Sequence, residues 1–331
     1  MKIVVIGCGS IGKRHLRNLK TLLKERNGEV IAFDVNKEAL EFVSKEYGIR
    51  TETDLNKALE EADGAFMCIP NSLHVPTALK AVKHGCHVFV EKPLSHTMEN
   101  VDELLRIAKE KNLTVTCGYN LRFYKPLQKV KDLLDAGAIG KVYGARVEFG
   151  YHLPSWRPNQ DYRKNYGAIR AQGGGVILDV IHEINYIRWL LGEAKELFCY
   201  AGKLSDMETD TEDYADMVIK FENNVIANVH LDYVQRAYRR SCHLIGEKGT
   251  ILWDFEGHKV DIFDSQKNEW SHFNEKDMDF NATYMAEEEH FLKCVEGKAK
   301  PVIDGEEAKQ DVVVALAALK SAETGKVVKL G

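Results

Sequence analysis

The sequence predicts an α/β chain in which a doubly wound parallel sheet is followed by an α+β domain with an open, mostly antiparallel sheet. Three observations support this fold class. A glycine-rich turn at residues 7–12 follows a short apolar run. Over the first third, further short apolar runs alternate with helical patterns, which is typical of a parallel sheet with helices on both faces. Beyond residue 122 the strands alternate apolar and polar residues, as in an antiparallel sheet with one buried face.

The first turn has the spacing of a dinucleotide-binding fingerprint. The glycines of Gly7–Gly12 precede a helical pattern, and the next apolar run ends at Asp34, 22 residues after the last glycine. Gly7 permits the tight turn, Gly9 lets the backbone approach a pyrophosphate, and Gly12 allows close packing of helix on strand. A purely structural glycine turn is the alternative. We predict a Rossmann domain that prefers NAD over NADP, because the Asp34 carboxylate binds ribose hydroxyls and repels a 2′-phosphate.

The other elements of the first third follow from the same alternation. We expect strands at 2–6, 29–33, 64–69, 86–90 and 113–117, and helices from 13, over 74–85 and over 97–111. In such sheets ligands lie beyond the carboxyl ends of the strands. The candidate site residues are therefore those that follow the strands: Asp34, Ile69, Pro70, Asn71, Glu91, Lys92, Pro93, Gly118, Tyr119 and Asn120.

The remainder of the chain predicts the second domain. A helix at 126–136 precedes a strand at 141–151, an aromatic and basic loop at 153–171 and a helix at 172–191. Strands follow at 197–202, 214–221, 225–233, 238–246, 250–254 and 259–263, and helices at 282–295 and 306–324 close the chain. We place the domains at 1–122 and 123–331, with the C-terminal helix able to pack back on the first domain.

Composition and charge narrow the class of protein. A net charge of −5 over 331 residues gives no reason to expect nucleic acid, and no apolar run has the length of a membrane span. The seven cysteines are dispersed without a C-x-x-C pair, which favours reduced thiols in the cytoplasm over disulfides or a metal site. The first strand begins at residue 2, so we expect no signal peptide.

Two groups of residues carry candidate chemistry. Lys92 directly follows a strand end, where its ammonium group can donate hydrogen bonds to a substrate oxygen; an ordinary surface charge pair with Glu91 is the alternative. Asp179 and His182 lie three residues apart on the helix expected at 172–191, so they should share a face. A carboxylate that orients an imidazole base would suit acid–base catalysis, whereas a buried histidine satisfied by its neighbour is the structural alternative.

Taken together, these segments resemble the glucose–fructose oxidoreductase, inositol dehydrogenase and rhizopine catabolism family of oxidoreductases. The resemblance covers nearly the whole chain and depends on five stretches: Gly7–Gly12, Ile69–Asn71 with His74, Glu91–Pro93, Gly118–Phe123 and Gly173–His182. It implies hydride transfer between a nicotinamide cofactor and a sugar, cyclitol or sugar nucleotide, and among these we expect a nucleotide-linked or surface-glycan sugar. The substrate is then a small molecule.

The resemblance also implies residue roles. Lys92 would be the catalytic lysine, His182 the base and Asp179 its orienting acid. The cofactor would be lined by Gly7, Gly9, Ser10, Ile11, Gly12, Asp34, Ile69, Pro70, Asn71, His74, Glu91 and Lys92. The substrate would be bound by Lys92, Asn120, Arg122, Trp156, Arg157, Tyr162, Arg163, His182 and Arg236, the arginines being suited to carboxylates or phosphates or else simply solvated.

One stretch departs from the family pattern. The family more often spaces its acid and histidine as D-x-x-x-H, whereas this chain has D-x-x-H. Counting from Asp179 puts Glu183 at the position of the base, and aligning on His182 puts Leu178 at the position of the acid. His182 is favoured as the base because it is the only imidazole in the segment.

Two other functions and one assembly state follow from the same residues. Some relatives use bound NAD to hydrolyse glycosides, and a non-enzymatic NAD-responsive binding protein would have the same first domain. The strands of the second domain carry apolar groups on both faces, for example Val218 opposite Met217. Such a face usually marks an interface, so we expect a homodimer or homotetramer.

Overall fold

The computed structural model describes residues 1–330, which form two compact units. The first contains Met1–Asn120 and Phe280–Gln310, and the second contains Leu121–Asp279 and the chain from Asp311 onward. The domain limits expected from the sequence assigned residues 280–310 to the second domain. Their place in the first unit reflects packing, since Phe291 contacts the rings of Phe66 and Phe89.

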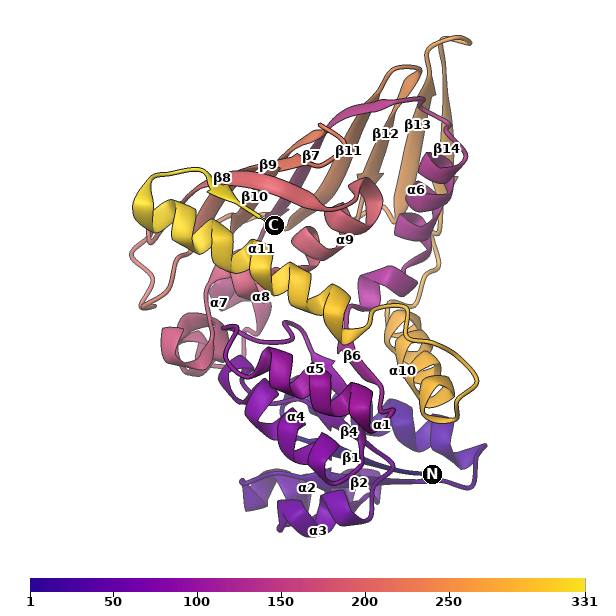
Figure 1. Cartoon of the computed structure of the whole chain (residues 1–331), viewed down its shortest axis with the longest axis vertical. Helices are drawn as coiled ribbons and strands as arrows, with labels where there is room; N and C mark the ends of the chain where they lie inside the picture. Colours follow the sequence, from indigo (N-terminus) through magenta and orange to yellow (C-terminus); the bar gives the residue numbers. More distant parts are fainter. Residues whose placement is uncertain (331) are drawn as a thin grey trace. The chain divides into compact units, whose positions relative to one another are not determined.

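The first unit is built on a six-stranded parallel sheet in the order β3-β2-β1-β4-β5-β6 (Figure 1). Its strands are β1 (Lys2–Ile6), β2 (Glu29–Phe33), β3 (Arg50–Glu52), β4 (Gly64–Met67), β5 (His87–Glu91) and β6 (Val115–Gly118). This strand order confirms the predicted Rossmann fold. The first two strands have the predicted bounds, whereas β3 is too short and too polar for its sequence pattern to show.

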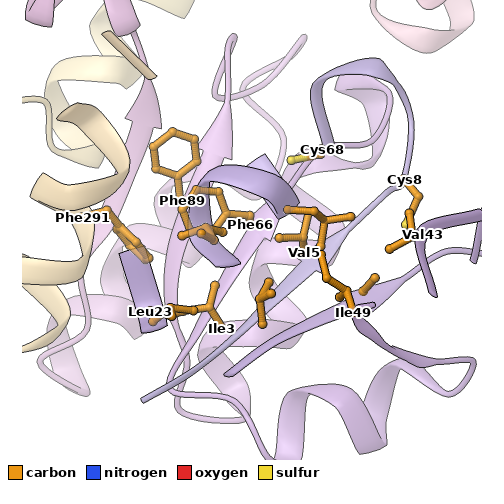
Figure 2. Close-up of a cluster of buried hydrophobic side chains, with 14 of the residues drawn as sticks. Ile3, Val5, Cys8, Leu23, Val43, Ile49, Phe66, Cys68, Phe89 and Phe291 are labelled. Carbon is orange, nitrogen blue, oxygen red and sulfur yellow. The ribbon is translucent and has the colours of Figure 1, made fainter. Parts of the chain in front are cut away.

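The helices of the first unit are α1 (Ser10–Lys24), α2 (Lys37–Tyr47), α3 (Leu55–Glu60), α4 (His74–Lys83), α5 (Val101–Glu110) and α10 (Asn281–Val295), with a short 3₁₀ helix η1 (Asn71–Leu73). Sequence analysis missed α2 and α3, although each begins at a side-chain cap: Asn36 accepts N–H groups at the start of α2, and Asp54 does so for α3. Figure 2 shows the core between α1, α10 and the sheet, in which Ile3, Leu23, Phe66, Phe89 and Phe291 are at most 1% exposed.

The second unit contains a nine-stranded sheet in the order β14-β13-β12-β11-β7-β10-β9-β8-β15. The strands are β7 (Val142–Gly150), β8 (Ala194–Gly202), β9 (Tyr214–Phe221), β10 (Ile226–Asp232), β11 (Arg239–Gly246), β12 (Gly249–Asp254), β13 (Lys259–Asp264), β14 (Glu269–Asn274) and β15 (Val328–Lys329). Among the strands of residues 1–330 in this sheet, β7 and β10 pair in parallel, and the other neighbouring strands pair antiparallel. The predicted mostly antiparallel sheet is thus confirmed.

Helices cover one face of this sheet (Figure 1). They are α6 (Lys125–Asp135), α7 (Leu153–Trp156), α8 (Val176–Asp179) and α9 (His182–Leu191), with 3₁₀ turns η2 (Asn120–Phe123), η3 (Tyr162–Lys164), η4 (Tyr166–Ala168) and η5 (Arg170–Gln172). The last helix, α11 (Gly305–Thr324), begins in the first unit and continues into the second. Met217 and Ile219 are buried, whereas Val218 is exposed, which gives β9 one covered face and one open face.

The helix expected over Gln172–Leu191 is wrong in one respect. The segment forms two helices, and residues 180–181 between them are a turn. The 3.3 Å bond from the Glu183 N–H to the Val180 carbonyl spans only three residues, which breaks the helical hydrogen-bond pattern. Asp179 therefore ends α8 and His182 begins α9, so the two do not lie on one continuous helical face.

Candidate functional site

The glycine loop after β1 has the geometry of a phosphate-binding turn. Gly7 has φ = +100°, and a Cβ there would lie 2.3 Å from the Cys68 carbonyl oxygen. A Cβ on Gly12 would lie 1.8 Å from the Gly7 oxygen, whereas a Cβ on Gly9 would meet nothing within 4 Å. The space beside Gly9 and the absence of acidic residues from the first turn of α1 suit an incoming pyrophosphate. Ser10 and Ile11 complete this loop at the start of α1.

Asp34, at the end of β2, joins the glycine loop to the next turn. One carboxylate oxygen accepts the Cys8 N–H at 2.6 Å, and the other accepts the Asn36 N–H at 2.8 Å. Burial and the Asp34 charge raise the pKa of the Cys8 thiol to about 12, so this thiol stays protonated. Each carboxylate oxygen has a second lone pair, which leaves capacity for the ribose hydroxyls that we predicted Asp34 would bind.

The residues after β4 and β5 are tied together by a buried histidine. Ile69, Pro70 and Asn71 follow β4, and His74 opens α4. The His74 Nδ1 lies 2.7 Å from the Pro93 carbonyl oxygen, and its Nε2 lies 2.9 Å from the Ile69 carbonyl oxygen. Burial lowers the pKa of His74, because loss of solvent outweighs the two carbonyl contacts. His74 therefore links two of the strand ends at which we expected the cofactor.

Lys92 lies directly beyond the end of β5 and is partly buried. Its N–H donates to the Glu91 carboxylate at 3.2 Å, and the peptide bond to Pro93 is cis. Burial acts to raise the pKa of Glu91, but a hydrogen bond and the charge of His15 outweigh it, so the net shift is downward. Glu91 is consequently a carboxylate that anchors the main chain of Lys92.

The second unit places Asp179 among tyrosines. The Tyr166 hydroxyl donates to Oδ1 of Asp179 at 2.5 Å, and the Tyr233 hydroxyl donates to Oδ2 at 2.9 Å. Asp179 is buried, and burial together with the Asp179 charge raises the pKa of Tyr233 well above its usual value. The two tyrosines fix the orientation of this carboxylate, and sequence analysis did not identify either of them.

Adjacent residues His182 and Glu183 differ sharply in environment. His182 is partly exposed, whereas Glu183 has no exposed surface. The Glu183 carboxylate accepts the Arg240 Nε–H at 2.7 Å and the Nη2–H at 3.3 Å, and the guanidinium lies 4.7 Å from the ring centre of Phe149. These two hydrogen bonds fix the orientation of the Glu183 carboxylate. Of the two candidate bases, only His182 reaches the surface of the second unit.

The residues predicted to bind substrate have mixed environments. The Asn120 amide donates to Thr283 in the first unit, and the Arg122 guanidinium lies 4.4 Å from the ring centre of Trp189 in the second. The Trp156 indole donates to the Tyr151 carbonyl, and the Tyr162 hydroxyl accepts the Glu208 N–H.

The three remaining arginines predicted to bind substrate differ in the groups that they contact. Arg163 pairs with Asp161 and Glu208, Arg236 lies 3.3 Å from the His152 ring nitrogen, and Arg157 is partly buried after α7. Arg163 is therefore committed to neighbouring carboxylates, which weakens its role as an anion ligand.

Several functional candidates were invisible in the sequence. His15, Glu287 and Glu288 are buried together in the first unit, with His15 between Glu91 and Glu288. In the sequence the run Glu287–Glu289 resembles a solvated helix face, and the long separation from residue 15 hides the contact. Only the position of His15 on the helix after the glycine turn could have suggested a role.

Comparisons with known proteins define first the class and then the family. Residues 1–119 match an oxidoreductase family with an NAD-binding Rossmann fold, so the first unit is the NAD-binding part of an oxidoreductase. Residues 127–252 match the GFO/IDH/MocA C-terminal domain. The chain belongs to the GFO/IDH/MocA oxidoreductase family, as the resemblance in its sequence indicated.

Individual relatives cover the whole chain. The myo-inositol 2-dehydrogenase of Thermotoga maritima is 29% identical and is aligned over 100% of this chain and 98% of its own. The scyllo-inositol 2-dehydrogenase (NAD(+)) of Bacillus subtilis is 26% identical over 100% of this chain and 96% of its own. The crystal structure of the WlbA dehydrogenase from Bordetella pertussis, in complex with NADH and UDP-GlcNAcA, has a TM-score of 0.85 at 21% identity and covers 100% and 99% of the two chains. This last match shows a shared fold.

Within residues 1–330, none of the helices combines the length and apolar character that crossing a bilayer requires. All seven cysteines are buried thiols.

Proposed function

We propose that this protein is an NAD-dependent dehydrogenase that oxidises a secondary hydroxyl group of a polyol ring, either a cyclitol or a free sugar. The observation that carries the proposal is Lys92, whose main chain is anchored at the carboxyl end of β5 in the NAD-binding unit. The full-length similarity to two inositol dehydrogenases supports the substrate class.

The proposed roles follow from the chemistry of each group. NAD, when bound, supplies the acceptor for the hydride that leaves the carbon. His182 removes the hydroxyl proton as the carbon–oxygen double bond forms, and the Lys92 ammonium group stabilises the developing negative charge on oxygen. The place of Asp179 as orienting acid stays a prediction, since its carboxylate also holds Tyr166 and Tyr233.

Three arginines of the second unit have carboxylate partners, which favours an uncharged ring over a sugar nucleotide. A diphosphate needs guanidinium groups with free donors. Arg163 and Arg240 instead bind neighbouring carboxylates, and Arg239 pairs with Asp254. The WlbA dehydrogenase was solved with UDP-GlcNAcA, so sugar nucleotides belong in the test as the competing class.

The test is steady-state kinetics with NAD and a panel of myo-inositol, scyllo-inositol, free hexoses and UDP-sugars. We expect NADH to accumulate with a cyclitol or a free sugar, and kcat/KM with NAD to exceed that with NADP because of Asp34. Turnover of UDP-sugars alone would show that the substrate class is wrong. Glycoside cleavage without net NADH would support an NAD-dependent hydrolase, and tight NAD binding without any turnover would support a binding protein.

We also propose that two copies associate through the open face of the nine-stranded sheet. Tyr200, Val218 and Ile226 are 72%, 44% and 47% exposed on neighbouring strands of this face. Apolar groups this exposed usually mark an interface. Light scattering at micromolar concentration should give a dimer or tetramer mass, and a monomer mass would contradict the proposal. Seven buried cysteine thiols fit the predicted cytoplasmic location.

A further inference from the structure

A single imidazole inside the first unit lies between two carboxylates from separate elements. His15 of α1 has no exposed surface. Its Nε2 lies 2.7 Å from the Glu91 carboxylate at the end of β5, and its Nδ1 lies 2.6 Å from the Glu288 carboxylate of α10. The ring packs against Phe66, Phe89 and Tyr284. These contacts hold His15 in one position.

The two acids beside His15 favour its charged form. An ionised carboxylate only accepts hydrogen bonds, so a ring nitrogen that faces one must carry hydrogen. Burial alone would lower the pKa of His15, but the bonds to Glu288 and Glu91 outweigh it and raise the pKa to about 10. The other charged groups near the ring are Glu287 on α10 and Arg14 on α1, and the Arg14 guanidinium lies 4.3 Å from the Tyr284 ring centre.

A chain of hydrogen bonds connects His15 to the candidate catalytic lysine. Glu91 uses one oxygen for His15, and its other oxygen accepts the main-chain N–H of Lys92. On the far side of Lys92, the Pro93 carbonyl oxygen contacts His74. The main chain at residue 92 is therefore anchored on both sides by a buried histidine, through Glu91 in one case and directly in the other.

We propose that His15 is a positioning residue for Lys92: its charged ring fixes the Glu91 carboxylate, which fixes the main chain at Lys92 and so aims the lysine side chain. The inference rests on the proposed role of Lys92. Helix α1 would then have two roles: its N-terminus binds phosphate, and its His15 positions Lys92. Displacement of a catalytic group by about 1 Å can cost about 100-fold in rate, so a small shift of Glu91 should be measurable.

Two amide substitutions separate the two bonds of His15. In His15→Gln the amide nitrogen takes roughly the place of Nε2 and can still donate to Glu91, while Glu288, whose pKa burial raises, can protonate and donate to the amide oxygen. In His15→Asn the shorter side chain reaches only the place of Nδ1, so it keeps Glu288 and abandons Glu91. Both variants remove the same charge.

We expect His15→Asn to lower kcat by about 10- to 100-fold. KM for the polyol and Kd for NADH should stay within about threefold of wild type, because the groups that bind them are untouched. His15→Gln should keep kcat within about threefold, and so should the control Glu288→Gln, which preserves the bond between His15 and Glu91. Equal kcat losses in the Asn and Gln variants, or losses that simply follow Tm, would overturn the inference, as would wild-type kcat in His15→Asn.

A second measurement does not depend on turnover. Lysines are labelled by reductive ¹³C-methylation, and the NMR signal of Lys92 is assigned with Lys92→Arg. We expect this signal to move in His15→Asn and to coincide with wild type in His15→Gln, since only the former releases Glu91. A signal that is identical in all three proteins overturns the inference. If the Lys92 signal moves only in His15→Asn but the protein turns over no polyol, the positioning role of His15 stands and the proposed function is wrong.

Discussion

Two groups of buried carboxylates, one in each unit, have different partners. In the second unit Glu183 pairs with the guanidinium of Arg240, and Asp311 pairs with that of Arg188. In the first unit three buried acids, Glu91, Glu287 and Glu288, surround the one imidazole of His15.

The difference concerns which charges depend on pH. An arginine stays protonated at every accessible pH, so its pairs are permanent. An imidazole loses its charge within the accessible range, and acids that outnumber their cations must take up protons. Burial and the neighbouring Glu91 raise the pKa of Glu287 well above its usual value. The group of acids around His15 in the NAD-binding unit should therefore respond to pH more than these two arginine pairs do.

The largest expected effect is a loss of kcat on substitution of His182 that substitution of the buried Glu183 does not cause. His182→Ala should lower kcat by about 10² to 10⁴ while NAD binding is retained, because a general base is removed. The matched variant Glu183→Gln should keep most of kcat, since Glu183 faces Arg240. The wild-type kcat/KM should rise with pH as the His182 imidazole loses its proton, because only the neutral ring can act as a base. If Glu183→Gln loses activity and His182→Ala does not, counting from Asp179 was the right alignment.

The contribution of the Glu183–Arg240 pair to stability can be tested by removing the arginine. Arg240→Met leaves Glu183 buried without its partner, which should lower the free energy of unfolding by about 3–5 kcal/mol. Urea denaturation at pH 7 measures this change. The double variant Glu183→Leu with Arg240→Met should recover most of the loss, and a double variant as unstable as the single one would show that the arginine acts through packing.

The charge of His15 should give the stability a pH dependence that the two arginine pairs lack. The folded-state pKa of His15, about 10, exceeds the unfolded value near 6.5, so its stabilising contribution is complete below pH 6.5 and is lost as pH rises toward 10. The stability difference between wild type and His15→Gln should therefore shrink across this window, by up to about 1.4 kcal/mol per pH unit. Urea titrations from pH 6 to pH 10 measure it. A constant difference would mean that His15 is neutral in the folded protein.

Substitution of Glu287 should have a smaller effect on the free energy of unfolding, and it should raise this free energy. Among residues 1–330, no donor lies within hydrogen-bond reach of its carboxyl oxygens. Its raised pKa means that the folded state holds a proton that the unfolded state releases above about pH 4.3. Glu287→Gln should therefore stabilise the protein at pH 8 by about 1 kcal/mol, with a smaller gain at pH 5. The neighbouring control Glu289→Gln should give no gain, since Glu289 pairs with Arg26.

The smallest effect is expected at the surface of the second unit. Arg163 is exposed, and its pairs with Asp161 and Glu208 lie in solvent. Arg163→Ala should change stability by less than about 1 kcal/mol. It should also leave kcat/KM for the polyol within about threefold, because this guanidinium is held by carboxylates. A large rise in KM would restore Arg163 as a substrate ligand and reopen the sugar-nucleotide class.

Local pattern was enough to predict most of the framework. The bounds of β1, β2 and β9 coincide with those expected from alternating apolar residues, and Gly7–Gly12 forms the expected turn. The interruption at residues 180–181 was missed because an apolar run suits a helix whether or not its hydrogen-bond ladder is continuous. The short strand β3 and the polar strand β14 lacked a period that could reveal them.

By itself the sequence determined the Rossmann turn, the acid after the second strand and the lysine beyond β5, since turn chemistry and strand period act over a few residues. Only the tertiary structure decided which charge neutralises which. Glu183 meets Arg240 across 57 residues, and His15 meets Glu288 across 273. A buried charge without a partner is energetically costly, so each of these two carboxylates lies beside a group that compensates it. That group comes from a distant part of the chain, and the local sequence pattern therefore does not predict it.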